Sequence, residues 1–117
     1  MEKKNLLFQL ADKISKEGFK ISLLLENKLQ YSIGDQLRRS CLSIVLNIVE
    51  GGARTSSKEK RQFLNIAFGS LKETKYLLYF IRELFLIKDK EVLELIDTLL
   101  IDINHLAKLI YGLLHKK

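Results

Sequence analysis

An unbroken heptad pattern near the end of the chain constrains the fold most. Apolar residues recur at alternating spacings of four and three, at Val92, Ile96, Leu99, Ile103, Leu106, Ile110 and Leu113. This repeat predicts a long helix that packs one face against other helices. The chain contains no proline, which leaves long helices uninterrupted.

Three more helices are expected before that segment. Apolar residues follow helical spacing in residues 5–27, 33–50 and 57–86, and the fourth helix begins near Asp89. Ser32 or Asp35 is a candidate cap for the second helix, and Gly51-Gly52 is expected to end it in a left-handed conformation. Ser56 and Glu59 form a predicted capping box for the third. The sequence therefore predicts an all-α, up-down-up-down four-helix bundle in one domain, residues 1–117.

The second helix has more apolar surface than one bundle core requires. Its apolar residues cover an arc of about 200°, whereas a surface helix needs a stripe of only about 100°. Leu42, Leu46 and Val49 are therefore expected to lie between subunits of a stable oligomer.

Polar residues occupy the remaining arc of this helix. If the second and third helices form a hairpin that turns near Arg54, these polar residues of the second helix face polar positions of the third helix. The expected structural seam consists of Gln36, Arg39, Ser43, Asn47, Ser70 and Glu73. Within it, Arg39 is expected to reach the Glu73 carboxylate or the Ser70 hydroxyl, since buried polar groups need partners. A ligand site is the alternative interpretation.

No pattern typical of an enzyme is found. The lone Cys41 lies in an apolar run and is expected to pack in the core. Asp102-x-x-His105 lacks the second motif that a di-metal bundle needs, and His115 has no acidic residue three positions before it. We therefore expect no catalytic residue, metal or cofactor. No secretory signal or membrane span is indicated, so a cytoplasmic protein is expected.

The charge balance favours an anionic partner. The net charge is +6 at pH 7, and the pI is about 9.5. The candidate nucleic-acid-binding residues are Arg38, Arg54, Lys58, Lys60 and Arg61. All but Arg38 cluster around the predicted turn, where the N-terminus of the third helix adds partial positive charge. A solvated basic turn is the alternative.

The central stretch reads QLRRSCLSIVLNIVEGGARTSSKEKRQFLNIAFGSLKET. It resembles the central motif of bacterial four-helix-bundle proteins encoded by intervening sequences of 23S rRNA genes. In its first half the matching residues are Gln36, Arg38, Arg39, Ser43, Ile44, Asn47, Ile48, Glu50 and Gly51. In its second half they are Ser57, Lys58, Phe63, Leu64, Ile66, Ala67, Gly69, Ser70, Leu71 and Glu73.

The resemblance implies a ring-shaped oligomer, commonly a homopentamer, without known enzymatic activity. A related branch of the family comprises accessory proteins of diversity-generating retroelements, which bind a reverse transcriptase and nucleic acid through basic surfaces. The expected function is therefore binding of RNA or DNA by an oligomeric bundle of one branch or the other. The alternative is a scaffold bundle that binds protein partners and no nucleic acid.

Overall fold

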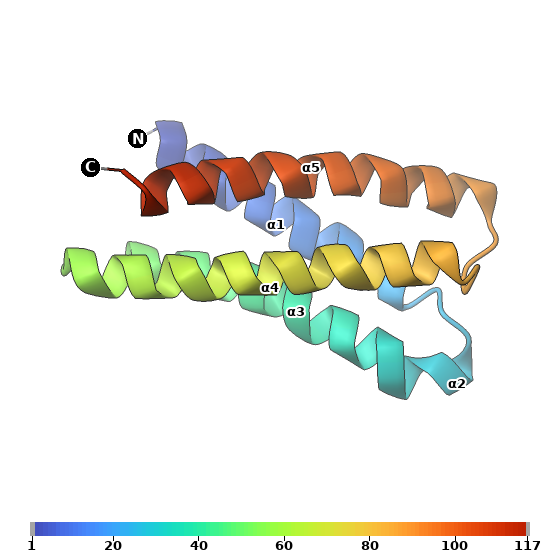
Figure 1. The fold of residues 1–117 in the computed structure, drawn as a ribbon. Helices are drawn as coiled ribbons and strands as arrows, with labels where there is room; N and C mark the ends of the chain where they lie inside the picture. The colour runs from blue at the N-terminus through green and yellow to red at the C-terminus, as the bar shows by residue number, and fades with distance from the viewer. Residues whose placement is uncertain (1, 117) are drawn as a thin grey trace.

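Four long helices, each antiparallel to the next, form the molecule (Figure 1). The computed structural model describes residues 2–116, and the side chains of residues 6–116. Its elements are α1 (Glu2–Ser22), α2 (Asn27–Leu29), the π-helical segment η1 (Gln30–Gly34), α3 (Asp35–Gly52), α4 (Ser57–Glu83) and α5 (Lys90–Leu114). Residues 2–116 contain no strand. The predicted all-α, up-down-up-down four-helix bundle is confirmed.

The helices pack in a square, in which α3 contacts α1 and α4, and α5 contacts the same two helices. The predicted heptad positions of α5 supply much of the core. Ile96, Leu99, Ile103, Leu106 and Ile110 are buried, and the two outermost positions of the repeat are half-buried. The interpretation of this repeat as a packing seam is confirmed.

The last two long helices begin at side-chain caps, of which the sequence predicted the first. The Glu59 N–H donates to Ser56 Oγ at 3.3 Å, at the start of α4. The Asp89 carboxylate accepts from the N–H groups of Glu91 and Val92 at 2.9 and 3.3 Å, at the start of α5. Such side-chain oxygens satisfy donors that the first turn of a helix leaves unpaired. Helix α4 ends at Glu83, three residues earlier than residue 86, where the prediction placed its end.

The second helix ends at Gly51-Gly52 as predicted, since α3 runs to Gly52. The predicted left-handed conformation was wrong, because no described glycine has a positive φ. Gly51 is buried against α4, where an added Cβ would lie 3.1 Å from the Phe63 Cβ. Gly51 therefore serves the close approach of two helices.

A second close approach joins α1 to α3. A Cβ added to Gly18 would lie 2.5 Å from Cys41 Sγ. One turn earlier on α1, Ser15 Oγ donates to the Cys41 carbonyl at 2.6 Å. Burial raises the pKa of the Cys41 thiol to about 12, so Cys41 packs as an unreactive core residue.

The connection between α1 and α3 differs from the prediction. Helical structure resumes at Asn27 and runs through α2 and η1 into α3, six residues before the predicted start at residue 33. Neither Ser32 nor Asp35 therefore caps the start of this helical stretch. Glu26 occupies the N-cap position of α2, and its side chain makes no capping hydrogen bond. Ser32 Oγ instead donates to the Leu29 carbonyl at 3.3 Å.

The two ends of the bundle carry different features (Figure 1). One end, called the terminal end below, holds residues 6–12, the α3–α4 turn and residues 108–116. The opposite end, called the elbow end, holds α2, η1 and the α4–α5 turn. None of the helices described is long and apolar enough to cross a membrane.

Candidate nucleic-acid interface

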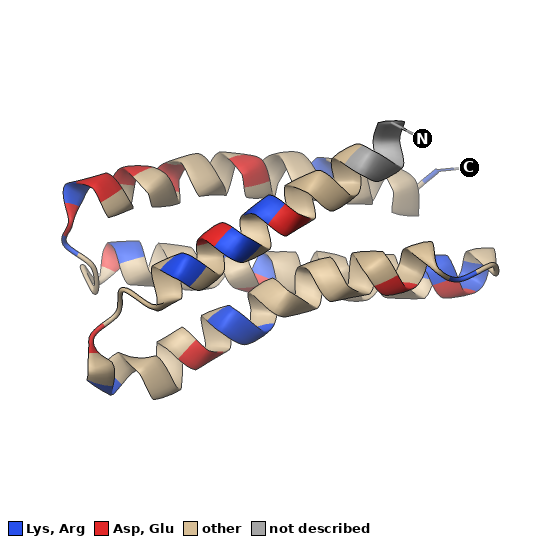
Figure 2. Ribbon diagram, turned by 180° about the vertical axis from the view of Figure 1, so that it is seen from behind, with Lys and Arg blue, Asp and Glu red and all other residues tan. Residues whose placement is uncertain are grey.

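Charge is distributed unevenly along the bundle. Residues 60–72 of α4 contain no acidic residue, nor do residues 103–116, which form the end of α5 and the two residues after it. The two segments lie side by side at the terminal end. In contrast, residues 83–97 at the elbow end carry Glu83, Asp89, Glu91, Glu94 and Asp97. Figure 2 shows these acidic segments in red along the N-terminal half of α5, and both blue and red segments at the α3–α4 turn. The terminal end is therefore the more positive end of the molecule.

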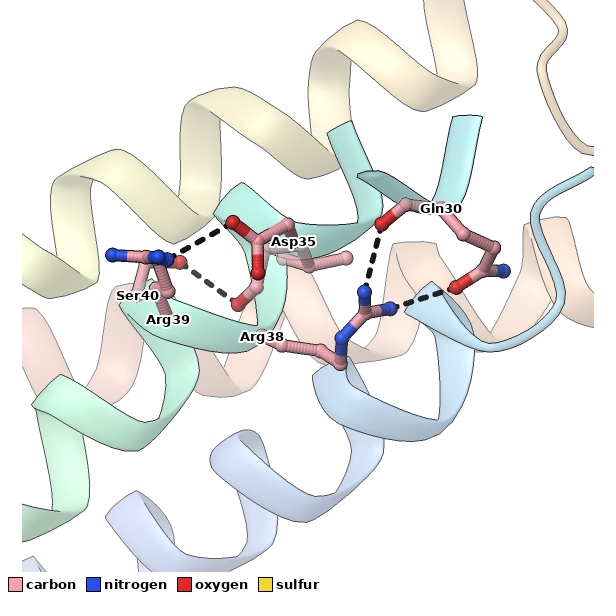
Figure 3. Close-up of polar contacts among 6 residues, drawn as sticks. Gln30, Asp35, Arg38, Arg39 and Ser40 are labelled. Carbon is pink, nitrogen blue, oxygen red and sulfur yellow. Dashed lines mark hydrogen bonds and ion pairs between the residues drawn. The ribbon is translucent and has the colours of Figure 1, made fainter. Parts of the chain in front are cut away.

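Arg38 lies apart from the other predicted basic residues. Arg38 and Arg54 are sixteen positions apart along α3 and its turn, which corresponds to roughly 24 Å at 1.5 Å per residue. Its guanidinium donates to Gln30 Oε1 at 2.8 Å, to the Gln30 carbonyl at 2.7 Å and to Ser22 Oγ at 3.2 Å. The pair of bonds to Gln30 is drawn in Figure 3. Arg38 thus fastens η1 to the end of α1.

The remaining four basic residues gather at the terminal end, and two of them are already engaged. Arg54 Nη2 donates to Glu50 Oε2 at 2.8 Å, and its Cζ lies 4.9 Å from the centroid of the Phe63 ring. Arg61 Nη2 donates to the Leu114 carbonyl, where a cation also suits the C-terminus of α5.

The two lysines of this turn differ in environment. Lys58 is exposed, in the first turn of α4. Lys60 is half-buried and lines an apolar groove of about 380 Å³ together with Leu7, Phe8 and Leu64. The turn therefore offers these two lysines to an anion, while its two arginines hold the local structure.

A polar seam joins α3 to α4. The sequence predicted such a seam, with partly different members. Ser43 Oγ and Ser70 Oγ lie 2.6 Å apart, and Asn47 Nδ2 donates to the Ser43 carbonyl at 2.7 Å. Thr74 Oγ1 lies 2.7 Å from Ser40 Oγ and 2.9 Å from the Ser70 carbonyl. These groups satisfy one another, so the seam is structural.

Three predicted members of the seam lie outside it. Arg39 is paired with Asp35 on its own helix, Nε to Oδ2 at 3.0 Å, and its side chain is 80% exposed (Figure 3). Gln36 and Glu73 also make no hydrogen bond within the seam, which is formed by Ser40, Ser43, Asn47, Ser70 and Thr74. The expected contact of Arg39 with Ser70 or Glu73 was wrong by about one helical turn, because α3 extends through Gly52 and the hairpin turns later than predicted.

Sequence reasoning missed Ser40 and Thr74. A signal for both was present: Ser40, Ser43 and Asn47 recur at spacings of three and four, and Thr74 follows Ser70 by four. Small polar residues with this spacing occupy one face of a helix and let a neighbouring helix approach closely.

The outward face of α3 is apolar. Leu42, Leu46 and Val49 are 46%, 56% and 51% exposed, and residues 40–49 contain no charge. Figure 2 shows this part of α3 as a tan stretch between a blue segment and a red one. A soluble monomer rarely exposes a continuous apolar row of this kind, which is typical of a protein interface.

The histidines and acidic residues form no centre within residues 2–116. This part of the chain contains no group of three or more His, Cys, Asp or Glu side chains that could hold a metal ion. His105 is exposed. Asp102, three residues before it, is paired instead with Lys13 of α1, Nζ to Oδ2 at 2.9 Å.

Comparisons with known proteins agree with this architecture. The crystal structure of a protein of unknown function from the S23 ribosomal protein family of Bacteroides thetaiotaomicron VPI-5482 has a TM-score of 0.83 to this chain. It is 23% identical, with 96% of this chain and 97% of that chain covered, so the likeness shows a shared fold. No curated protein matches the chain. The model of the family described as 23S rRNA-intervening sequence protein matches residues 3–112. The chain therefore belongs to the 23S rRNA-intervening sequence protein family.

Proposed function

We propose that the protein is a non-enzymatic oligomer that binds RNA or DNA through the terminal end of its bundle. The observation that carries this proposal is the separation of charge along the molecule. The acid-free segments 60–72 and 103–116 lie together with the α3–α4 turn, while acidic residues gather at the elbow end. Phosphate binding is dominated by such electrostatic attraction.

Self-association is supported by the apolar outward face of α3. Burying Leu42, Leu46 and Val49 between subunits would remove a row of exposed apolar side chains from water. Five subunits is the number that the family resemblance implies. In a ring, each subunit would present one basic end, so that weak phosphate contacts add together.

The family supports a proposal for the biological setting. The protein would act in the cytoplasm, either as an rRNA intervening-sequence protein or as an accessory protein of a retroelement, with a reverse transcriptase as its partner. Neither the matching family nor the similar structure indicates a class of enzyme.

A scaffold that binds only proteins is the second candidate function. The exposed apolar row of α3 favours it, because that row could receive a different protein as readily as another subunit. A scaffold of this kind would form its complex without measurable affinity for RNA or DNA.

Fluorescence anisotropy with labelled RNA and DNA separates the two candidates. The test variant carries Lys58→Glu and Lys60→Glu at the terminal end. The matched control carries Lys88→Glu and Lys90→Glu, which change the net charge equally at the acid-rich elbow end. We expect the test variant to bind much more weakly than the control. Equal binding by both variants, or no binding by the wild type, would contradict the proposal.

A further inference from the structure

A row of aromatic rings joins α4 to α5 at the terminal end. The rings of Phe68 and Tyr111 have centroids 6.4 Å apart, and those of Tyr111 and His115 are 3.9 Å apart. Lys72 Nζ lies 5.2 Å from the Phe68 centroid. Tyr111 is 56% exposed, so its ring is available to a ligand.

Lysines flank this row. Lys72 lies one turn after Phe68 on α4, and Lys108 lies about one turn before Tyr111 on α5. Lys72, Lys108 and Lys116 are all exposed. The ion pairs formed among the described residues include none of the three. The row lies within the acid-free segments 60–72 and 103–116, so no carboxylate of these segments offsets the lysines.

The contact between α4 and α5 at the elbow end is built differently. There Arg82 donates to Asp97 through two bonds, Nε to Oδ1 at 2.7 Å and Nη2 to Oδ2 at 3.0 Å. A paired arginine and carboxylate join α4 and α5 at the elbow end. At the terminal end Arg61 of α4 donates to the Leu114 carbonyl of α5. Beside that contact, the rings of Phe68, Tyr111 and His115 lie with lysines that have no described carboxylate partner.

We propose that this row binds unpaired bases of a single-stranded nucleic acid. A base would stack on the Tyr111 ring, and Lys72, Lys108 and Lys116 would contact the neighbouring phosphates. Proteins that bind single strands combine aromatic stacking with a positively charged track in this way. In a duplex the bases are already stacked on one another, so a paired strand can use only the lysines. This inference rests on the proposed function and specifies the class of nucleic acid.

The test compares binding of one labelled sequence of about 16 nucleotides, a length that suits single-strand binding sites. The sequence is presented as single-stranded RNA, as single-stranded DNA, and annealed to its complement. Four forms of the full chain are measured by fluorescence anisotropy: the wild type, Tyr111→Ala, Tyr111→Phe and Tyr76→Ala. Tyr76 is the matched control because it is also exposed, at 64%, but lies outside the row.

We expect the wild type to bind single strands more tightly than the duplex. Tyr111→Ala should weaken single-strand binding roughly 5- to 150-fold, the range for the loss of one base–aromatic stack. Tyr111→Phe keeps the ring and should bind like the wild type, as should Tyr76→Ala. Circular dichroism melting of each variant checks that the bundle is folded.

Each other outcome has a definite meaning. If the wild type binds nucleic acid and Tyr111→Ala binds single strands equally well, this inference is wrong while the proposed function stands. Preference of the wild type for the duplex would also overturn it. Absence of binding by the wild type to all three probes would contradict the proposed function itself.

Discussion

Replacement of Gly18 by alanine tests the close approach of α1 and α3. Alanine in a helix interior normally stabilises a protein by up to about 1 kcal/mol relative to glycine. Here the new Cβ would lie 2.5 Å from Cys41 Sγ, whereas non-bonded heavy atoms prefer a separation of about 3.5–4.0 Å. Since Gly18 and Cys41 are both buried, the helices themselves must move apart by about 1 Å.

The expected effect is the difference between two opposing terms. Overpacking a well-packed core costs about 1–3 kcal/mol, and the gain in helix propensity offsets part of that cost. We expect Gly18→Ala to lower the free energy of unfolding by about 1–2 kcal/mol. In a Cys41→Ala background the obstructing sulfur is absent, and the same change should become neutral or stabilising. The resulting coupling energy of about 2 kcal/mol is within the range for residues in contact.

Urea unfolding, followed by circular dichroism at one fixed protein concentration, measures these values. The concentration is fixed because association would add to the apparent stability. Gly69→Ala is the control, since no atom lies within 4 Å of a Cβ placed there, and it should stabilise α4. If Gly18→Ala stabilises the protein as much as Gly69→Ala does, the packing of α1 against α3 described above is wrong.

Three further predictions address the elbow, the α3 face and a surface ion pair. Arg38→Lys should destabilise the fold by about 1.5–3 kcal/mol and speed amide exchange in η1, because an ammonium cannot reproduce the forked bonds of the guanidinium; unchanged exchange would contradict this. Leu46→Glu should reduce the mass in light scattering to that of a monomer, whereas Ile101→Glu, at a 69% exposed position of α5, should not; a monomeric wild type would refute the interface. The hydrogen bond from Arg82 lowers the pKa of Asp97. The stabilising effect of the Arg82–Asp97 pair should therefore be present above pH about 4 and lost as the pH falls further; an ordinary Asp97 pKa in an NMR titration would contradict this.

The features that sequence reasoning predicted correctly depend on nearby residues. Ser56 and Glu59 are three residues apart, and the predicted start of the last helix near Asp89 is one residue from its observed start at Lys90. The heptad of α5 is a repeat within one helix. Such patterns determine secondary structure and the buried face without knowledge of the other helices.

The features that it missed depend on contacts between distant segments. Nothing near Gln30 in the sequence indicates a π-helical segment there, because the bonds that hold it come from Arg38 on the next helix. Glycine is a residue type typical of helix C-caps. Only the position of Phe63 shows that Gly51 serves packing instead.

The candidate site shows the same division. The sequence predicted that four basic residues lie near the α3–α4 turn, because those residues are close to one another in the chain. It could not show that Arg61 is bonded to the carbonyl of Leu114, or that the rings of Phe68 and Tyr111 meet across two helices. The register of the α3–α4 hairpin was also mispredicted, because it depends on the residue at which α3 ends.

The salt dependence of nucleic-acid binding tests the central claim most directly. The logarithm of the association constant of the wild type should fall linearly with the logarithm of the salt concentration, because binding to phosphates releases counterions. Lys58→Glu with Lys60→Glu should flatten that slope by about 0.7–0.9 for each phosphate that the variant no longer neutralises. Lys88→Glu with Lys90→Glu should leave it unchanged. A wild-type slope near zero, or the same slope in both variants, would contradict the assignment of the terminal end as the nucleic-acid-binding surface.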